Sequence, residues 1–172
     1  MIGPPPSSVW RGTATRSRPD HVARYIVSVK TPMSASDAFS YMADLRNFAE
    51  WDPGVSAVRQ IDGDGPGPAT SFDVDVEAGP STITLRYVTD EFEAGSKAVV
   101  RARNSFLTSL DVITVTEDDG ATIVTYDAEL TLNGPLRLGD PLLAMSFGKI
   151  GDRAAAGLIA ALDGERTEQP VT

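Results

Sequence analysis

The feature that most constrains the fold of this chain is a repeated alternation of apolar and polar residues through its middle. In residues 71–77, SFDVDVE, every second side chain is apolar, and residues 83–87 and 124–132 repeat the pattern. Successive side chains of a β-strand point to opposite faces, so each run predicts a strand with one buried and one solvated face. Turn-forming Gly, Pro, Asp and Asn residues separate the runs, at 62–68, 78–80, 117–120 and 133–135.

The complete pattern predicts seven strands and one long helix. The strands are expected at 21–30, 54–62, 69–77, 81–92, 96–104, 108–117 and 121–133. After Pro135 the spacing of apolar residues changes to that of a helix, because Leu143, Phe147 and Ile150 begin a single stripe that continues to Ala161. Three glycines interrupt this helix, which suggests close packing against the sheet or a kink.

Two short helices are expected between the first and second strands. Ser34 and Asp37 form an S-x-x-D start, in which a hydroxyl and a carboxylate satisfy free amides of the first helical turn. Asp44 can cap a second helix at 45–50, and Pro53 and Gly54 then turn the chain. Because an antiparallel sheet of this length has to bury one face, the long C-terminal helix is expected to cover it. The predicted fold is α+β, a curved seven-stranded antiparallel sheet wrapped around the C-terminal helix.

The length of 172 residues fits one domain. We expect this domain at 20–164, after a flexible leader at 1–19 that contains three consecutive prolines. Residues 165–172 are expected to form a polar tail.

Composition excludes several classes of function. The net charge of −9, from 15 basic and 24 acidic residues, argues against a nucleic-acid partner. The chain has no cysteine, and its single histidine, His21, lies at the start of the first strand, so no metal or cofactor is expected. No stretch of 18 apolar residues is present, so no membrane span is expected, and the cytoplasm is the expected location.

Short motifs and the order of elements resemble the SRPBCC (START-like, helix-grip) superfamily, and most closely its polyketide cyclase/dehydrase-like branch. The resemblance covers about residues 21–163. The motifs that carry it are VxxP at 29–32, FSYMAD at 39–44, NxxxWxP at 47–53, DVITV at 111–115 and GATxVTY at 120–126. The resemblance implies a helix-grip fold with a deep, mostly apolar cavity between sheet and helix.

The resemblance and the predicted fold together suggest a function but leave three alternatives. The first is binding of a small hydrophobic or aromatic molecule, polyketide-, lipid- or quinone-like, in that cavity. The second is an aromatase/cyclase or dehydratase-like enzyme that acts on a polyketide in the same cavity. The third is an interaction or dimerisation module whose cavity is filled by side chains, and a homodimer is compatible with the sequence. No catalytic residue is assigned.

The candidate ligand-binding residues come from the apolar faces of the strands and helices and from one polar set. They are Phe48, Trp51, Phe72, Leu85, Tyr87, Arg101, Arg103, Asp111, Tyr126, Leu143 and Phe147. Trp51 is expected mainly to close one end of the core and secondarily to line the cavity. The hydroxyls of Tyr87 and Tyr126 could serve catalysis, or they could form local hydrogen bonds in the core.

The fifth and sixth strands carry the polar set. If the hairpin turns around Leu107, Arg103 lies opposite Asp111 and Arg101 lies opposite Ile113. If this face is inside, the two arginines, Asp111 and Ser109 give polar anchors in a dry cavity. If it is outside, Arg103 and Asp111 form a weak surface pair. The alternation of residues does not decide between the two faces.

Overall fold

The computed structural model describes residues 22–168, without the side chains of residue 78 and residues 137–145. Its strands are β1 (Ala23–Thr31), β2 (Val55–Asp62), β3 (Ser71–Ala78), β4 (Ser81–Glu93), β5 (Lys97–Arg103), β6 (Leu107–Asp118), β7 (Ala121–Leu132) and β8 (Glu165–Thr167). Its helices are α1 (Ala35–Ala43), η1 (Leu45–Asn47), α2 (Phe48–Trp51), η2 (Gly134–Gly139) and α3 (Asp140–Ala161). The expected leader and His21 lie outside the described residues.

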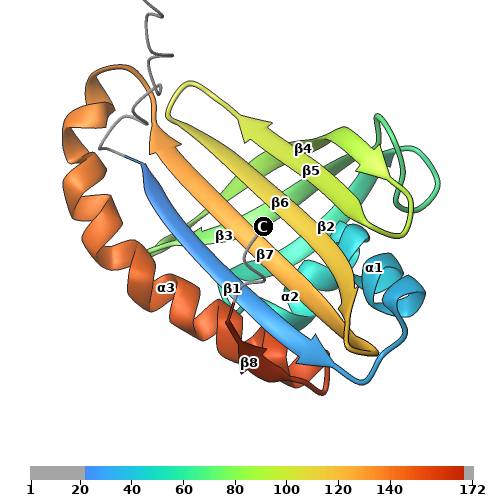
Figure 1. Ribbon diagram of the computed structural model, residues 1–172. Helices are drawn as coiled ribbons and strands as arrows, with labels where there is room; N and C mark the ends of the chain where they lie inside the picture. Colours follow the sequence, from blue (N-terminus) through green and yellow to red (C-terminus); the bar gives the residue numbers. More distant parts are fainter. Residues whose placement is uncertain (1–21, 169–172) are drawn as a thin grey trace, which may run out of the picture.

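The strands form one antiparallel sheet in the order β2-β3-β4-β5-β6-β7-β1-β8. Figure 1 shows the sheet bending, so that β2, β3 and β4 lie behind the other strands, with α3 running along one side. All seven expected strands are present within a few residues of their predicted bounds, and the helix-grip α+β fold is confirmed.

An eighth strand, β8, follows α3 and differs from the predicted count of seven. Its three residues pair with Ser28–Lys30 of β1, in the segment for which the sequence predicts a polar tail. Three residues are too few to show an alternation of apolar and polar side chains, so this strand has no sequence signal of its own.

The caps that the sequence predicts are present at both short helices. The Ser34 hydroxyl oxygen accepts a hydrogen bond from the amide of Asp37 at 3.1 Å and donates to its carboxylate at 2.7 Å. The Asp44 carboxylate accepts from the amide of Arg46 at 3.1 Å. The second helix, expected at 45–50, consists of η1 and α2 and ends one residue later, at Trp51.

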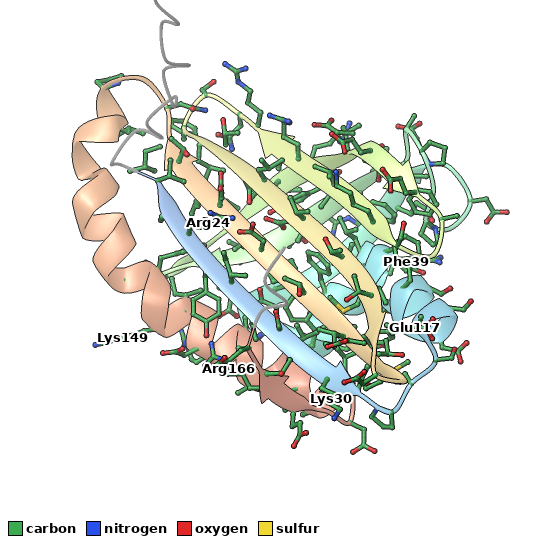
Figure 2. The ribbon with its side chains drawn as sticks, viewed as in Figure 1. Arg24, Lys30, Phe39, Glu117, Lys149 and Arg166 are labelled. Carbon is green, nitrogen blue, oxygen red and sulfur yellow. The ribbon has the colours of Figure 1, made fainter. Side chains whose placement is uncertain are left out.

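Two of the three glycines in α3 allow close packing, as the sequence suggests. A Cβ atom at position 157 would lie 1.9 Å from the carbonyl oxygen of Trp51, and one at position 151 would lie 2.3 Å from the ring of Tyr25. Gly148 has no such neighbour within 4 Å. The opposite side of α3 faces outward, and Lys149 points away from the sheet in Figure 2. The glycines therefore let α3 approach α2 and β1 directly.

Candidate functional site

A cavity of about 530 Å³ lies between the inner face of the sheet and α3. Its lining is mostly apolar and comes from β1, β2, β3, β4, β6, β7, α2 and α3 and from the turn after α2. Apolar residues that line it include Val27, Ile83, Leu85, Leu107, Leu130, Phe147, Ala154 and Leu158. Cavities of this size and character are typical sites for small organic ligands.

Three aromatic rings pack together at one side of the cavity. The ring of Trp51 lies 4.9 Å from the ring of Phe48 and 5.2 Å from the ring of Tyr126, centre to centre, and both contacts are edge-on. Trp51 is 2% exposed and also lines the cavity, so it closes the core and forms part of the wall. Its indole N–H has no hydrogen-bond partner among the described residues.

Four buried polar side chains form a hydrogen-bonded cluster on the inner face of β4, β6 and β7. The Tyr126 hydroxyl donates to one carboxylate oxygen of Asp111 at 3.0 Å, and the Ser109 hydroxyl donates to the other at 3.2 Å. The Tyr87 hydroxyl donates to the Ser109 oxygen at 2.9 Å. Ser109 and Asp111 share a face because they are two residues apart on one strand. All four residues line the cavity.

Burial determines the protonation of this cluster. Loss of water around Asp111 raises the pKa of its carboxyl group to about 7, against the opposing effect of the hydrogen bonds from Tyr126 and Ser109. Burial, and next the nearby charge of Asp111, raise the pKa of Tyr87 and of Tyr126 well above the usual value. Both phenols therefore stay protonated near neutral pH, while Asp111 can gain or lose a proton there.

A second acid, Asp52, lines the cavity just after α2. Its half-buried carboxylate accepts a hydrogen bond from the amide of Gly54 at 2.8 Å. Burial raises the pKa of Asp52, while the Gly54 hydrogen bond and the charge of Arg153 oppose that shift. Arg153 is exposed on α3 and also lines the cavity. The negative charge of Asp52 adds to the rise in the pKa of Asp111.

Seven of the eleven candidate residues line the cavity: Phe48, Trp51, Leu85, Tyr87, Asp111, Tyr126 and Phe147. Phe72 is fully buried in the core and is not part of the lining. Leu143 lies in α3, but its side chain is outside the described part of the chain. The remaining two candidates are Arg101 and Arg103.

The pairing of β5 with β6 that follows from a hairpin around Leu107 is wrong; it would put both arginines on the face of Asp111. The observed partners of Arg103, Arg101 and Asp111 are Thr108, Leu110 and Val100, respectively. The Asn104 side chain closes the turn by accepting from the amides of Phe106 and Leu107 at 2.8 and 2.9 Å. Compared with a hairpin around Leu107, this turn shifts the register of β5 against β6 by three residues. A shift by an odd number puts the arginines and Asp111 on opposite faces of the sheet.

The register places Asp111 and Ser109 inside and both arginines outside. Arg101 is exposed and pairs with Asp90 at 2.5 Å. Arg103 is exposed and lines a separate surface hollow near the β5–β6 turn. Figure 2 shows Arg24, another arginine of the outer face, beside β1 and β7, and it pairs with Asp127.

Asp52 and Ser109 are among the residues of the site that are absent from the sequence-based candidate set. The sequence indicated Asp52 only as part of the turn at Pro53 and Gly54, because a D-P-G stretch is typical of turns. Ser109 was considered together with the arginines and is in fact separated from them. Its position two residues before Asp111 on a strand was the signal that linked the two.

Two features are absent from the described part of residues 22–168. Within this range, no three His, Cys, Asp or Glu residues form a group that could hold a metal ion. None of the helices described there is long and apolar enough to cross a membrane.

Comparison with known proteins places the chain in a family. The family model for polyketide cyclases, dehydrases and lipid transport proteins matches residues 22–163, and the chain belongs to this family. The predicted resemblance to the polyketide cyclase-like branch of the START-like superfamily is confirmed. No curated protein matches the chain in sequence.

Solved structures share the fold at low sequence identity. The Zhui aromatase/cyclase from Streptomyces sp. R1128 matches with a TM-score of 0.66 and 11% identity over 83% of this chain and 94% of its own. A START superfamily protein from Mycobacterium smegmatis matches with a TM-score of 0.65 and 14% identity over 83% and 97%. The di-domain aromatase/cyclase StfQ of the steffimycin pathway has a TM-score of 0.63 and 15% identity over 84% of this chain, which spans 51% of that protein.

Proposed function

We propose that the protein binds a small hydrophobic or aromatic molecule, polyketide-, lipid- or quinone-like, in the cavity between the sheet and α3. The observation that carries the proposal is the cavity of about 530 Å³ with a mostly apolar lining. Burial of apolar ligand surface there is favourable by about 25 cal/mol per Å². Family membership supports the same class of ligand. An open volume also argues against a module whose cavity is filled by side chains.

Two alanines of α3 provide a matched test. Ala154 lines the cavity, and Ala156 is exposed two residues further along the same helix. Ala154→Phe adds a ring to the cavity, whereas Ala156→Phe adds the same ring outside it. Binding is measured by Nile red fluorescence and by native mass spectrometry of protein purified under mild conditions. We expect Ala154→Phe to lose the dye and any co-purifying molecule, and Ala156→Phe to behave as the wild type.

Two results would contradict the binding proposal. The first is a wild-type protein that carries no co-purifying molecule and does not bind Nile red. The second is equal Nile red binding by the two phenylalanine variants, since the dye would then lie outside the cavity. Circular dichroism of each variant checks that the fold is intact.

A second candidate function is a dehydratase- or cyclase-like reaction in the same cavity. It is favoured by Asp111, whose carboxyl group lines the cavity and has a pKa of about 7. A general base works best when its pKa lies near the operating pH. In a dehydration, the Asp111 carboxylate would take a proton from the carbon next to a ketone. It would then return that proton to the hydroxyl group on the following carbon, which leaves as water.

The test substrate is 4-hydroxy-4-(2-naphthyl)butan-2-one, a β-hydroxy ketone that gives a strongly absorbing enone on loss of water. We expect the wild type to accelerate the reaction with a rate that rises through pH 7, and Asp111→Asn to abolish the acceleration. Arg103→Ala is the control, because Arg103 lies on the outer face and should not matter. Equal rates for the wild type and Asp111→Asn would remove Asp111 from the reaction. A cytoplasmic location and a homodimer stay predictions.

A further inference from the structure

The hydroxyl protons of the polar cluster are all engaged in hydrogen bonds within the cluster. Tyr126 and Ser109 each donate their only hydroxyl proton to Asp111, and Tyr87 donates its proton to Ser109. A carboxylate has about four lone-pair positions, and these two hydroxyl groups occupy two of them. An ionised Asp111 therefore leaves the cluster with acceptor capacity and no unused hydroxyl proton. A ligand that reaches the cluster has to supply the next proton.

The charges around the cavity also disfavour an anionic ligand. Of the described residues that line it, Asp52, Glu77 and Asp111 are acidic, and Arg153 is basic. Glu77 and Arg153 are exposed, whereas Asp111 is 2% exposed and Asp52 is half-buried. A second anion beside Asp111 would meet like charge in a poorly solvated place, which is strongly unfavourable.

From these observations we propose that the cavity selects a neutral ligand that carries a phenolic or alcoholic hydroxyl and rejects the corresponding carboxylate, with Asp111 accepting the ligand's hydrogen bond. This inference rests on the proposed function and specifies its ligand class. The rings of Phe48 and Trp51 pack against the ring of Tyr126, a member of the cluster, so an aromatic body can pack there while its hydroxyl reaches Asp111.

Three fluorenes of the same shape test the selection: 2-hydroxyfluorene, 2-methoxyfluorene and fluorene-2-carboxylate. Binding is measured by equilibrium dialysis at pH 8, above the pKa of about 7 of Asp111. A hydrogen bond to a charged group predicts that 2-hydroxyfluorene binds roughly 10- to 100-fold more tightly than 2-methoxyfluorene. The carboxylate should bind most weakly.

Asp111→Asn removes the charge and keeps the shape, and it should abolish the preference for the hydroxyl compound. Asp127→Asn is the matched control, because Asp127 is the neighbour of Tyr126 on β7 but pairs with Arg24 on the outer face. This control should keep the wild-type preference. Nuclear magnetic resonance spectra of both variants check that they are folded.

A pH series on the wild type provides a second measurement if Asp111→Asn does not fold. Asp111 is faced by Tyr87 on β4, Tyr126 on β7 and the charge of Asp52 after α2. The pKa of both tyrosines lies well above the usual value, and Asp52 is the other acid whose pKa is raised. Protonation of Asp111 at pH 5.5 should reduce the preference for 2-hydroxyfluorene several-fold and leave 2-methoxyfluorene unchanged.

The outcomes separate this inference from the proposed function. Carboxylate binding as tight as that of 2-hydroxyfluorene would overturn the inference, and its loss in Arg153→Gln would identify Arg153 as the true anchor. An unchanged preference in folded Asp111→Asn would also overturn it. In each of these cases the cavity still binds an apolar molecule. If neither 2-methoxyfluorene nor 2-hydroxyfluorene bound to the wild type, the proposed function itself would fail, and the inference with it.

Discussion

Two aspartates on opposite faces of one sheet show how position determines chemistry. Asp75 on β3 points outward, and Asp111 on β6 points into the cavity. Hydrogen bonds from Arg59 and then from Thr84 lower the pKa of Asp75 to about 2, whereas burial raises that of Asp111 to about 7. The outer face places arginines beside its acids, and the inner face places neutral hydroxyl groups beside Asp111. One residue type therefore gives a permanent surface charge on one face and a titrating group on the other.

The largest effect is expected from a second acid on the inner face without hydroxyl partners. Ile113 is 0% exposed and lies two residues after Asp111 on β6. Ile113→Asp should lower the free energy of unfolding by about 3–5 kcal/mol or prevent folding, because it buries a carboxyl group without partners. Thr114→Asp on the outer face should change it by less than about 0.5 kcal/mol. Urea unfolding measures both, and similar losses would contradict the difference between the faces.

The next effect is the pH dependence of stability. Because the pKa of Asp111 rises from 3.8 to about 7 on folding, the native state holds one more proton between these values. Stability should therefore be highest near pH 4 and fall as pH rises to about 7, by an amount on the order of a few kcal/mol. The raised pKa of Asp52 adds a further loss of stability as pH rises.

Asp111→Asn should flatten this fall, and urea unfolding between pH 4 and pH 8 measures it. Asp75→Asn is the control on the outer face. In the wild type, the lowered pKa of Asp75 gives a contribution to stability that is present above pH 4 and is lost as pH falls toward 2. A wild type whose stability rises between pH 5 and pH 8 would contradict the assignment of Asp111.

Removal of one hydroxyl partner should have a smaller effect. Tyr126→Phe deletes the hydrogen bond to Asp111 and should lower the free energy of unfolding by about 1–3 kcal/mol. It should also raise the pKa of Asp111 further, because that bond favours the carboxylate. Tyr41→Phe, which deletes a hydrogen bond to Glu50 on the surface, is the control and should cost less. Equal losses of stability in the two variants, measured by thermal unfolding, would show that the buried hydrogen bond stabilises the protein no more than the surface one.

The smallest effect is expected from an ion pair of the outer face. Arg24→Gln breaks the contacts of Arg24 with Asp127 and Glu129 and should change stability by less than about 1 kcal/mol. Salt should reduce the difference between wild type and variant, since exposed pairs are screened. A loss as large as that of Tyr126→Phe would contradict the contrast between the two faces.

Much of the fold followed from local patterns in the sequence. The alternation in residues 71–77 and 124–132 is visible without any neighbour, and so is the Ser34 cap. The candidates Leu85, Tyr87 and Tyr126 line the cavity because the apolar faces of their strands point inward. The pairing of β5 with β6 was missed because it depends on which residues Asn104 holds in the turn. Asp52 was missed as a member of the site because a D-P-G stretch is typical of a turn, and Ser109 was considered only together with the two arginines.

The order of strands and helices, the caps of the short helices and the family could be predicted from the sequence alone, because these depend on residues close together along the chain. Which face of β5 and β6 lies inside could be known only from the three-dimensional pairing of the strands, since a register shift of three residues exchanges the faces. The observed register places Asp111 among hydroxyl groups and puts Arg101 and Arg103 on the surface. The acidic lining of the cavity, and the use of the cluster's hydroxyl protons within the cluster, arise from contacts between segments that are distant in sequence.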